Sequence, residues 1–247
     1  MTDSPYSSLR LYLMQVATIT DSPTITSGPD TLPVPCYLIQ TKDGKNILID
    51  SGYPRTEKKE EVVEGAVILH GNDVIWQLAT IGVRPADIDL LICTHFHDDH
   101  AGNNGAFPNA RLVVQRLQYE VARAGDPRFA DCRQQWDQPA SRYQLLDGDT
   151  ELLPGIELGE TSGHVPGHQS VLVNLPETGP VLLAIDAVAF QTDFTADRPV
   201  GPPDDDGVAA STRKLLELSE KKHVSLVIFG HDGLQWATLK QLPDFFD

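Results

Sequence analysis

The chain has 247 residues, a length that α/β domains commonly reach undivided, so we expect a single domain over residues 1–247. Its 35 acidic and 19 basic residues give a formal net charge of −16, which would repel phosphate backbones and anionic lipid surfaces, so nucleic acid is not an expected partner. No stretch approaches the roughly 20 apolar residues that span a bilayer, which excludes a membrane protein. The first ten residues lack the basic start and apolar run of a secretory signal, so we expect a cytoplasmic protein.

The three cysteines point to the same compartment. Cys36, Cys93 and Cys132 are odd in number, widely spaced and free of any CxxC pair. This pattern argues against a disulfide framework and against a thiolate zinc site. We therefore expect reduced, partly buried thiols.

Apolar runs of strand length alternate with helical patterns along the first half of the chain. Strands are expected over residues 9–16, 36–40 and 46–50, the last two joined by Asp43-Gly44, a hairpin turn signal. Asn72 and Asp73 can begin a helix that runs to residue 81 and stops at Gly82. An apolar strand over 88–94 then leads directly into a polar cluster, which places that cluster at a strand's carboxyl end.

The second half of the chain continues the alternation. Strands are expected over residues 111–114, 156–161, 170–175, 181–185 and 224–229, and helices over 117–124 and 207–222. The mixture predicts an α/β fold class.

The polar cluster is the segment from Thr94 to His100, which holds His95, His97, Asp99 and His100 within six residues. Imidazole nitrogens and carboxylate oxygens are the ligands of zinc and other borderline divalent metals. A solvated polar loop would be the alternative, but so many ionisable groups beside a buried strand would cost several kcal/mol of desolvation without a metal. The segment therefore predicts a metal site.

Three further candidate ligands also follow strand-like runs: His164, Asp186 and His231. Five histidines and two carboxylates exceed the needs of one four-coordinate ion, so we predict two adjacent ions. Asp186 ends an otherwise apolar strand and needs a strong cationic partner, which makes it the expected bridging carboxylate.

The sequence resembles a known superfamily at these positions. The run from His95 to His100 matches the HxHxDH motif of the metallo-β-lactamase superfamily, and His164, Asp186 and His231 follow in the order of its remaining ligands. The resemblance implies an αββα sandwich. Residues 32–38, 100–107, 163–170 and 229–232 further resemble the dinuclear N-acyl-homoserine lactone lactonases, which are quorum-quenching hydrolases.

The resemblance also implies a role for each ligand. The family pattern assigns His95, His97 and His164 to one ion, Asp99, His100 and His231 to the other, and Asp186 to both. Zinc is the expected metal, with iron, cobalt and manganese as alternatives that suit the same ligands. His168, the second histidine of the PGH-like segment, is expected to support the site rather than bind metal.

The ligand assignments and the family resemblance predict a metal-dependent hydrolase that opens a lactone ring, or cleaves a related small-molecule ester, with a metal-bound hydroxide. Asp99 is the expected catalytic residue, relaying a proton to the leaving alkoxide. The alternative is a glyoxalase II-like thioester hydrolase. A metal-binding module of the kind that is fused to a flavodoxin-like domain is less expected, because the sandwich would use all 247 residues. A homodimer is left open.

One position departs from the lactonase pattern. The family carries a Tyr three residues after the bridging Asp, and Ala189 stands there in this chain. Since Ala189 offers no hydroxyl to the substrate, another donor such as Tyr53 or Tyr143 would have to replace it, or the substrate would need a better leaving group.

Overall fold

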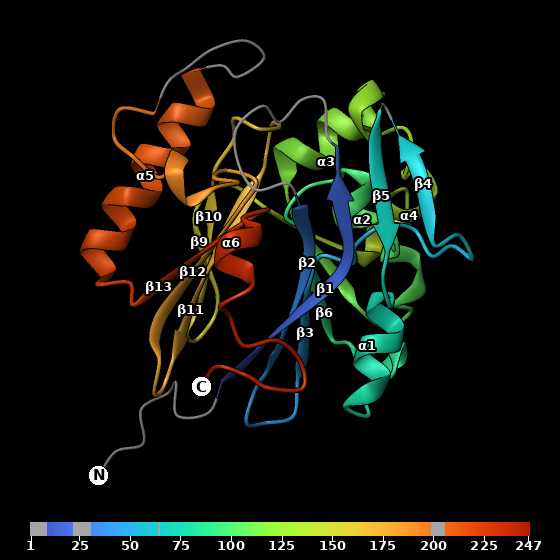
Figure 1. The fold of residues 1–247 in the computed structure, drawn as a ribbon, viewed down its shortest axis with the longest axis horizontal. Coiled ribbons are helices and arrows are strands. Elements are labelled where there is room, and N and C mark those ends of the chain that lie inside the picture. The colour runs from blue at the N-terminus through green and yellow to red at the C-terminus, as the bar shows by residue number, and fades with distance from the viewer. Residues whose placement is uncertain (1–8, 22–30, 64, 199–205) are drawn as a thin grey trace.

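Two β-sheets face each other in a computed structural model that describes residues 9–21, 31–63, 65–198 and 206–247 (Figure 1). The larger sheet has eight strands in the order β4-β5-β1-β2-β3-β6-β7-β8. Its strands are β1 Arg10–Thr20, β2 Thr31–Gln40, β3 Asn46–Ile49, β4 Glu60–Val63, β5 Ala66–His70, β6 Leu90–Ile92, β7 Arg111–Gln115 and β8 Tyr143–Leu146.

The smaller sheet has five strands in the order β13-β12-β11-β10-β9. They are β9 Thr150–Leu153, β10 Ile156–Glu160, β11 Gln169–Leu175, β12 Gly179–Ile185 and β13 Leu226–Phe229. Strands β12 and β13 are parallel, and the hairpin neighbours β10, β11 and β12 alternate in direction. Strands β10, β12 and β13 therefore all end at the same edge.

Helices cover the outer faces of both sheets, which confirms the αββα sandwich (Figure 1). The helices α1 and α3 lie on the larger sheet and α5 lies on the smaller one. The α-helices are α1 Val74–Thr80, α2 Asp98–Ala101, α3 Arg116–Arg123, α4 Arg133–Trp136, α5 Asp206–Lys222 and α6 Gly233–Trp236; short 3₁₀ turns cover Pro85–Asp87, Asn104–Ala106, Pro127–Phe129, Ala140–Arg142 and Gln191–Asp193. Within the described ranges, no helix combines the length and the apolar character needed to cross a membrane.

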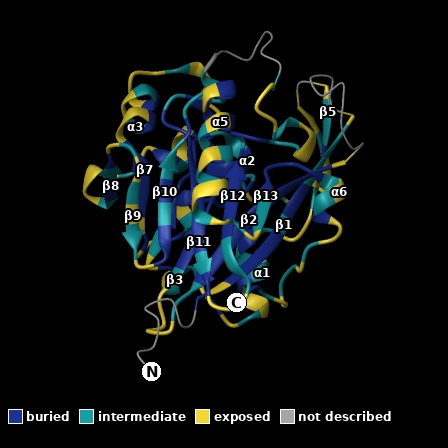
Figure 2. Cartoon of the chain, turned by 90° about the vertical axis from the view of Figure 1, so that its left-hand side faces the viewer, coloured by how far each residue is buried: buried dark blue, intermediate teal, exposed yellow. Residues whose placement is uncertain are grey.

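Strand β1 shows why its sequence reads as a nearly continuous apolar run. Leu11 and Leu13 pack between the sheets, whereas Tyr12 and Met14 pack under the helices on the other face. A sheet that is buried on both faces leaves no polar alternation in its central strands. Figure 2 shows the result, with the central strands buried and the exposed residues on the outer faces of helices such as α5.

The predicted strands and helices are all present, with shifted ends. The apolar strand expected over 88–94 is only three residues long, and the short helix α2 forms inside the metal motif. The edge hairpin of β4 and β5 was missed, because Val62 and Leu69 are exposed and Ile68 is the one buried residue of the two strands, which is too little to set a period of two.

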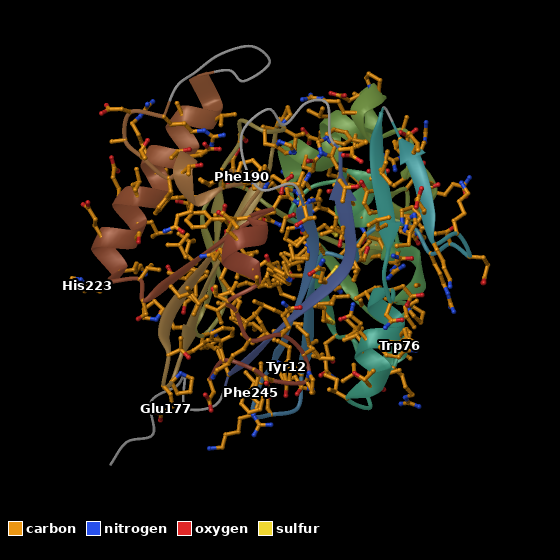
Figure 3. The ribbon with its side chains drawn as sticks, in the orientation of Figure 1. Tyr12, Trp76, Glu177, Phe190, His223 and Phe245 are labelled. Atoms are coloured by element: carbon orange, nitrogen blue, oxygen red, sulfur yellow. The ribbon has the colours of Figure 1, made fainter. Side chains whose placement is uncertain are left out.

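The carboxyl ends of several parallel strands meet at one edge of the sandwich. Strands β3 and β6 are parallel in the larger sheet, as β12 and β13 are in the smaller one. Gln169 joins the two sheets there, since its backbone N–H donates to the Thr94 carbonyl at 3.1 Å and its side chain donates to the Cys93 carbonyl at 2.8 Å. In Figure 3, Glu177 and Phe190 mark the chain just before and just after β12, at opposite ends of the sandwich. Polar residues that follow these strands therefore converge.

A matched pair of valine variants measures how much the core between the sheets contributes to stability. Val173 is fully buried in that core and Val62 is 68% exposed on the edge strand β4. We expect Val173→Ala to lower the free energy of unfolding by roughly 2 kcal/mol, because it leaves a cavity, and Val62→Ala to change it by less than about 0.5 kcal/mol. Urea denaturation of both variants is the measurement. Equal losses would contradict this assignment of the core.

Candidate metal centre

All seven predicted ligands lie together at the edge where the strands end. His95, His97, Asp99 and His100 lie on the segment after β6, partly on α2, and His164 follows β10. Asp186 directly follows β12, and His231 lies two residues after β13. Three overlapping groups have ligand atoms within 4.8 Å of one another: His95, His97 and His164; His95, Asp99 and His100; and His100, Asp186 and His231.

The first group, which we call the three-histidine cluster, consists of His95, His97 and His164. The Nδ1 atom of His97 lies 3.1 Å from Nε2 of His95 and 3.1 Å from Nε2 of His164. His95 is fully buried, whereas the His164 side chain is 31% exposed. The cluster is thus closed on one side and reached by solvent on the other.

The second and third groups share His100, and together they bring Asp99, His100 and His231 close to one another. We call these three residues the mixed cluster. Oδ2 of Asp99 lies 3.5 Å from Nε2 of His100 and 3.8 Å from Nε2 of His231. All three residues are buried.

Asp186 lies between the two clusters and contacts histidines of both. Its Oδ2 lies 3.3 Å from Nε2 of His164, and its Oδ1 lies 3.4 Å from Nε2 of His100. Nε2 of His231 lies 3.3 Å from both oxygens. This is the arrangement that a carboxylate shared by two ions requires.

The spacing of the donor atoms fits metal ions. Ligands at about 2.0–2.2 Å from a tetrahedral ion are about 3.3–3.6 Å apart, close to the separations found in both clusters. Two ligand atoms, Nε2 of His100 and Oδ1 of Asp186, are buried without a hydrogen-bond partner among the described residues. Buried polar atoms are costly when unpaired, so these two atoms fit a site that holds a cation.

Hydrogen bonds around the clusters set the histidine tautomers. The Thr94 hydroxyl donates its only hydrogen to Asp50 Oδ2 at 2.7 Å, so it can only accept from Nδ1 of His95, at 3.2 Å. Nδ1 of His100 donates to the same Asp50 oxygen at 2.8 Å, and Nδ1 of His231 donates to the Pro33 carbonyl at 2.9 Å. In each ring, Nε2 is the atom left to face the clusters.

Asp50 was missed in the sequence, although the signal was present. It is fully buried, directly follows the apolar strand β3, and accepts from the Thr94 backbone N–H at 2.8 Å as well as from the groups named above. An acid at the end of an apolar strand was the feature that singled out Asp186. The same reasoning applies to Asp50, which orients His100.

His168 supports the site without joining either cluster, as expected. Ser170 donates its hydroxyl hydrogen to the Ala184 carbonyl, so Thr161 donates to Ser170 and His168 Nδ1 donates to Thr161, at 2.8 Å. The ring is fully buried, its centroid lies 5.2 Å from that of His95, and burial lowers its pKa to about 3. His168 is therefore a neutral packing partner of the His95 ring.

The two clusters differ in how strongly they hold protons. Burial lowers the pKa of His97 to about 4, and burial together with the neighbouring histidines lowers that of His95 well below its usual range. Burial also acts to lower the pKa of His231, but Asp186 and Asp99 outweigh it and raise that pKa to about 9. The three-histidine cluster is thus neutral at pH 7, whereas the mixed cluster carries protons until metal displaces them.

The remaining candidates have other surroundings. Burial raises the pKa of Asp98 to about 6, and its side chain belongs to none of the three groups. The Tyr143 hydroxyl donates to the Trp136 carbonyl, so it is occupied away from the clusters. Burial raises the pKa of Tyr53, and the charges of Asp99 and Asp98 raise it further, so the surroundings of Tyr53 include the mixed cluster.

The cysteines are buried, as expected, and unsuited to nucleophilic catalysis. Burial raises the pKa of Cys36 and Cys93 well above the usual range and that of Cys132 to about 12. Since the thiolate is the reactive form, none of the three is activated.

Comparison with known proteins gives consistent matches. A model of the metallo-beta-lactamase superfamily matches residues 29–231. An N-acyl homoserine lactonase of a Bacillus species is 36% identical over 223 residues, which cover 87% of each chain. The N-acyl homoserine lactonase AttM of Rhizobium radiobacter is 33% identical over 279 residues, which cover 97% of this chain and 99% of that one.

Solved structures match over the same length. An N-acyl homoserine lactone hydrolase, with the product N-hexanoyl-L-homoserine bound at its catalytic metal center, superposes with a TM-score of 0.82 at 31% identity, covering 96% of this chain and 98% of that one. The dizinc quorum-quenching lactonase AidC superposes with a TM-score of 0.71, covering 97% and 94%. Its identity of 16% makes that likeness one of fold alone.

The proton held by His231 predicts pH-dependent zinc uptake. Because its pKa in the metal-free protein is about 9, above the usual 6.5, the contacts of the imidazolium with Asp186 and Asp99 stabilise the fold below pH 6.5, and this contribution is lost as the pH rises through 9. Zinc must displace that proton, so we expect its apparent affinity to rise between pH 6.5 and 9, with proton release. Calorimetry in two buffers of different ionisation enthalpy measures the release, which His231→Asn should reduce. Zinc uptake without proton release would contradict the assignment.

Proposed function

The chain belongs to the metallo-beta-lactamase superfamily, and from that premise we propose that it is a dinuclear metal-dependent hydrolase, formed as one domain, that opens N-acyl-homoserine lactones or related lactones and esters. The observation that carries the proposal is Asp186, whose two oxygens face two separate ligand clusters. The lactonase relatives, at 33–36% identity, support the substrate class.

The residues that would hold the ions follow from the two clusters. The three-histidine cluster would bind one ion, the mixed cluster the other, and Asp186 both. Zinc suits the imidazole and carboxylate donors, as do iron, cobalt and manganese. When bound, two divalent ions activate water for attack near neutral pH and polarise the ester carbonyl.

The protein's own groups would then direct the reaction. Water adds to the lactone carbonyl carbon, the bond from that carbon to the ring oxygen breaks, and the ring oxygen leaves as an alkoxide that needs a proton. Asp99 is buried beside His100 and His231, where its carboxylate can take the proton from the attacking water and pass it to the alkoxide. The product is an open-chain hydroxy acid, which releases a proton to the solution at neutral pH.

A substrate panel tests the proposal. We expect the zinc-loaded protein to hydrolyse acyl-homoserine lactones, γ-lactones or δ-lactones, with a product heavier by one water and measurable acidification. Asp186→Asn should reduce the rate at least a hundredfold, because it removes the charge that both clusters share. Mass spectrometry and pH-stat titration are the measurements. Rapid thioester cleavage with no lactone turnover would favour the glyoxalase II-like alternative instead.

Ala189 predicts a preference for substrates with good leaving groups. Its carbonyl accepts from the His231 backbone N–H at 3.0 Å, so the backbone of residue 189 lies beside a residue of the mixed cluster, and alanine has no side-chain hydrogen-bond donor. One well-placed donor contributes roughly 3 kcal/mol to transition-state stabilisation. We therefore expect Ala189→Tyr to raise kcat/KM for a long-chain acyl-homoserine lactone at least tenfold while leaving that for an aryl ester nearly unchanged.

Ala189→Phe is the control for this substitution, because it adds the same ring without the hydroxyl. An equal gain from Phe and Tyr would assign the effect to packing. No gain from Tyr, with efficient lactone hydrolysis by the native protein, would show that another donor such as Tyr53 already serves.

A further inference from the structure

Two ligands of the site directly follow a glycine whose missing side chain leaves room for backbone. Gly163 precedes His164, and Gly230 precedes His231. A Cβ atom built on either glycine would lie closer than 3.0 Å to backbone atoms of another element. Real Cβ atoms do not approach backbone this closely, so any larger residue would have to move one of the two segments.

Gly230 packs against the peptide that carries the shared carboxylate. A Cβ atom there would lie 2.7 Å from the carbonyl oxygen of Ile185, 2.9 Å from its carbonyl carbon and 3.0 Å from Oδ1 of Asp186. Oδ1 is the oxygen that faces His100 and His231. Gly230 therefore sets the distance between the shared carboxylate and the mixed cluster.

The Ile185 peptide cannot easily adjust to such pressure. Ile185 has a φ of 53°, a left-handed conformation that is unusual for a β-branched residue, and its side chain is 1% exposed in the core between the sheets. Packing must hold it there against the strain. A larger residue at position 230 would therefore displace Oδ1 of Asp186 or His231, because the backbone of Ile185 cannot shift to relieve the clash.

Gly163 has a corresponding place beside the three-histidine cluster. A Cβ atom there would lie 2.5 Å from the carbonyl carbon of Gly207 and 2.5 Å from the backbone nitrogen of Val208, in the first turn of α5. The Ser211 hydroxyl ties α5 to the same loop by donating to the Ser162 carbonyl at 2.6 Å. The first turn of α5 thus fixes the position of the loop that carries His164.

We propose that Gly163 and Gly230 are positioning residues that separately set the geometry of the two ion sites, Gly163 through His164 and Gly230 through Asp186 and His231. This inference rests on the two-ion site proposed above. Its consequence is selective: substitution at Gly230 weakens the ion in the mixed cluster, and substitution at Gly163 weakens the ion in the three-histidine cluster.

Zinc content and affinity, measured on Gly230→Ala and Gly163→Ala, test the inference. We expect the native protein to hold two ions per chain by elemental analysis and each variant to hold one tightly, with the dissociation constant of the other raised at least tenfold in a chelator competition. Gly159→Ala is the matched control in β10, because a Cβ there has only one neighbour within 4 Å, the Asp149 Oδ1 at 3.9 Å. It should hold two ions with native affinity.

Double variants identify which ion is lost. In the Gly230→Ala background, His97→Asn should remove the remaining ion, whereas His231→Asn should change little, because its site is already weakened. Melting temperatures of the metal-free proteins separate a general loss of stability from a selective loss of metal. Should Gly230→Ala not fold, Gly163→Ala with the reciprocal double variants decides the question.

The results distinguish the two-ion site from the positioning role of the two glycines. Native protein that never holds more than one ion would refute the two-ion site itself. Native protein with two ions, together with glycine variants that also hold two at native affinity, would overturn the positioning role alone. Loss of both ions to the same extent in either variant would likewise overturn it, because the two glycines would not act separately.

Discussion

The site depends on the burial of one carboxylate, Asp186, among the nitrogen atoms of four histidines. These nitrogens lie 3.3–3.8 Å from its oxygens, and its side chain is only 8% exposed. Burial acts to raise the pKa of Asp186, but the surrounding histidines lower it well below its usual range, so it stays charged. Burial also acts to raise the pKa of Asp99, but His100 and His231 lower it to about 2. Asp186 and Asp99 thus carry negative charge into the sandwich, where divalent ions can balance it.

A frame of hydrogen bonds around the ligands turns this charge into a defined geometry. Asp50 accepts hydrogen bonds from both Thr94 and His100, so one buried acid holds the first and the last residue of the segment that carries the motif. His231 is fixed by the backbone of β2 through Pro33, which belongs to the opposite sheet. Because the rings of His95, His100 and His231 are held by Nδ1, their Nε2 atoms face the clusters before any ion binds, which lowers the cost of binding.

The two clusters are unlike in charge and access. The mixed cluster is buried, carries Asp99, and has Asp50 behind His100, whereas the three-histidine cluster is neutral and reaches solvent at His164. A small-molecule substrate would therefore approach from the His164 side. This asymmetry gives the site a buried, charged side and a neutral side that solvent reaches.

The sequence by itself predicted which residues could bind metal and the strands that precede most of them. Strand-length apolar runs ending in His95, Asp186 and His231 were enough to place these residues at a sheet edge, because parallel strands end on the same side. It did not reveal the hairpin of β4 and β5, in which Ile68 is the one buried residue. It also did not reveal the role of Asp50, whose partners Thr94 and His100 are more than forty residues away. Only the tertiary structure decided which oxygen of Asp186 faces which cluster, and that Gly163 and Gly230 pack against backbone. Such contacts depend on how the two sheets and a helix pack against one another, and local residue patterns do not determine that packing.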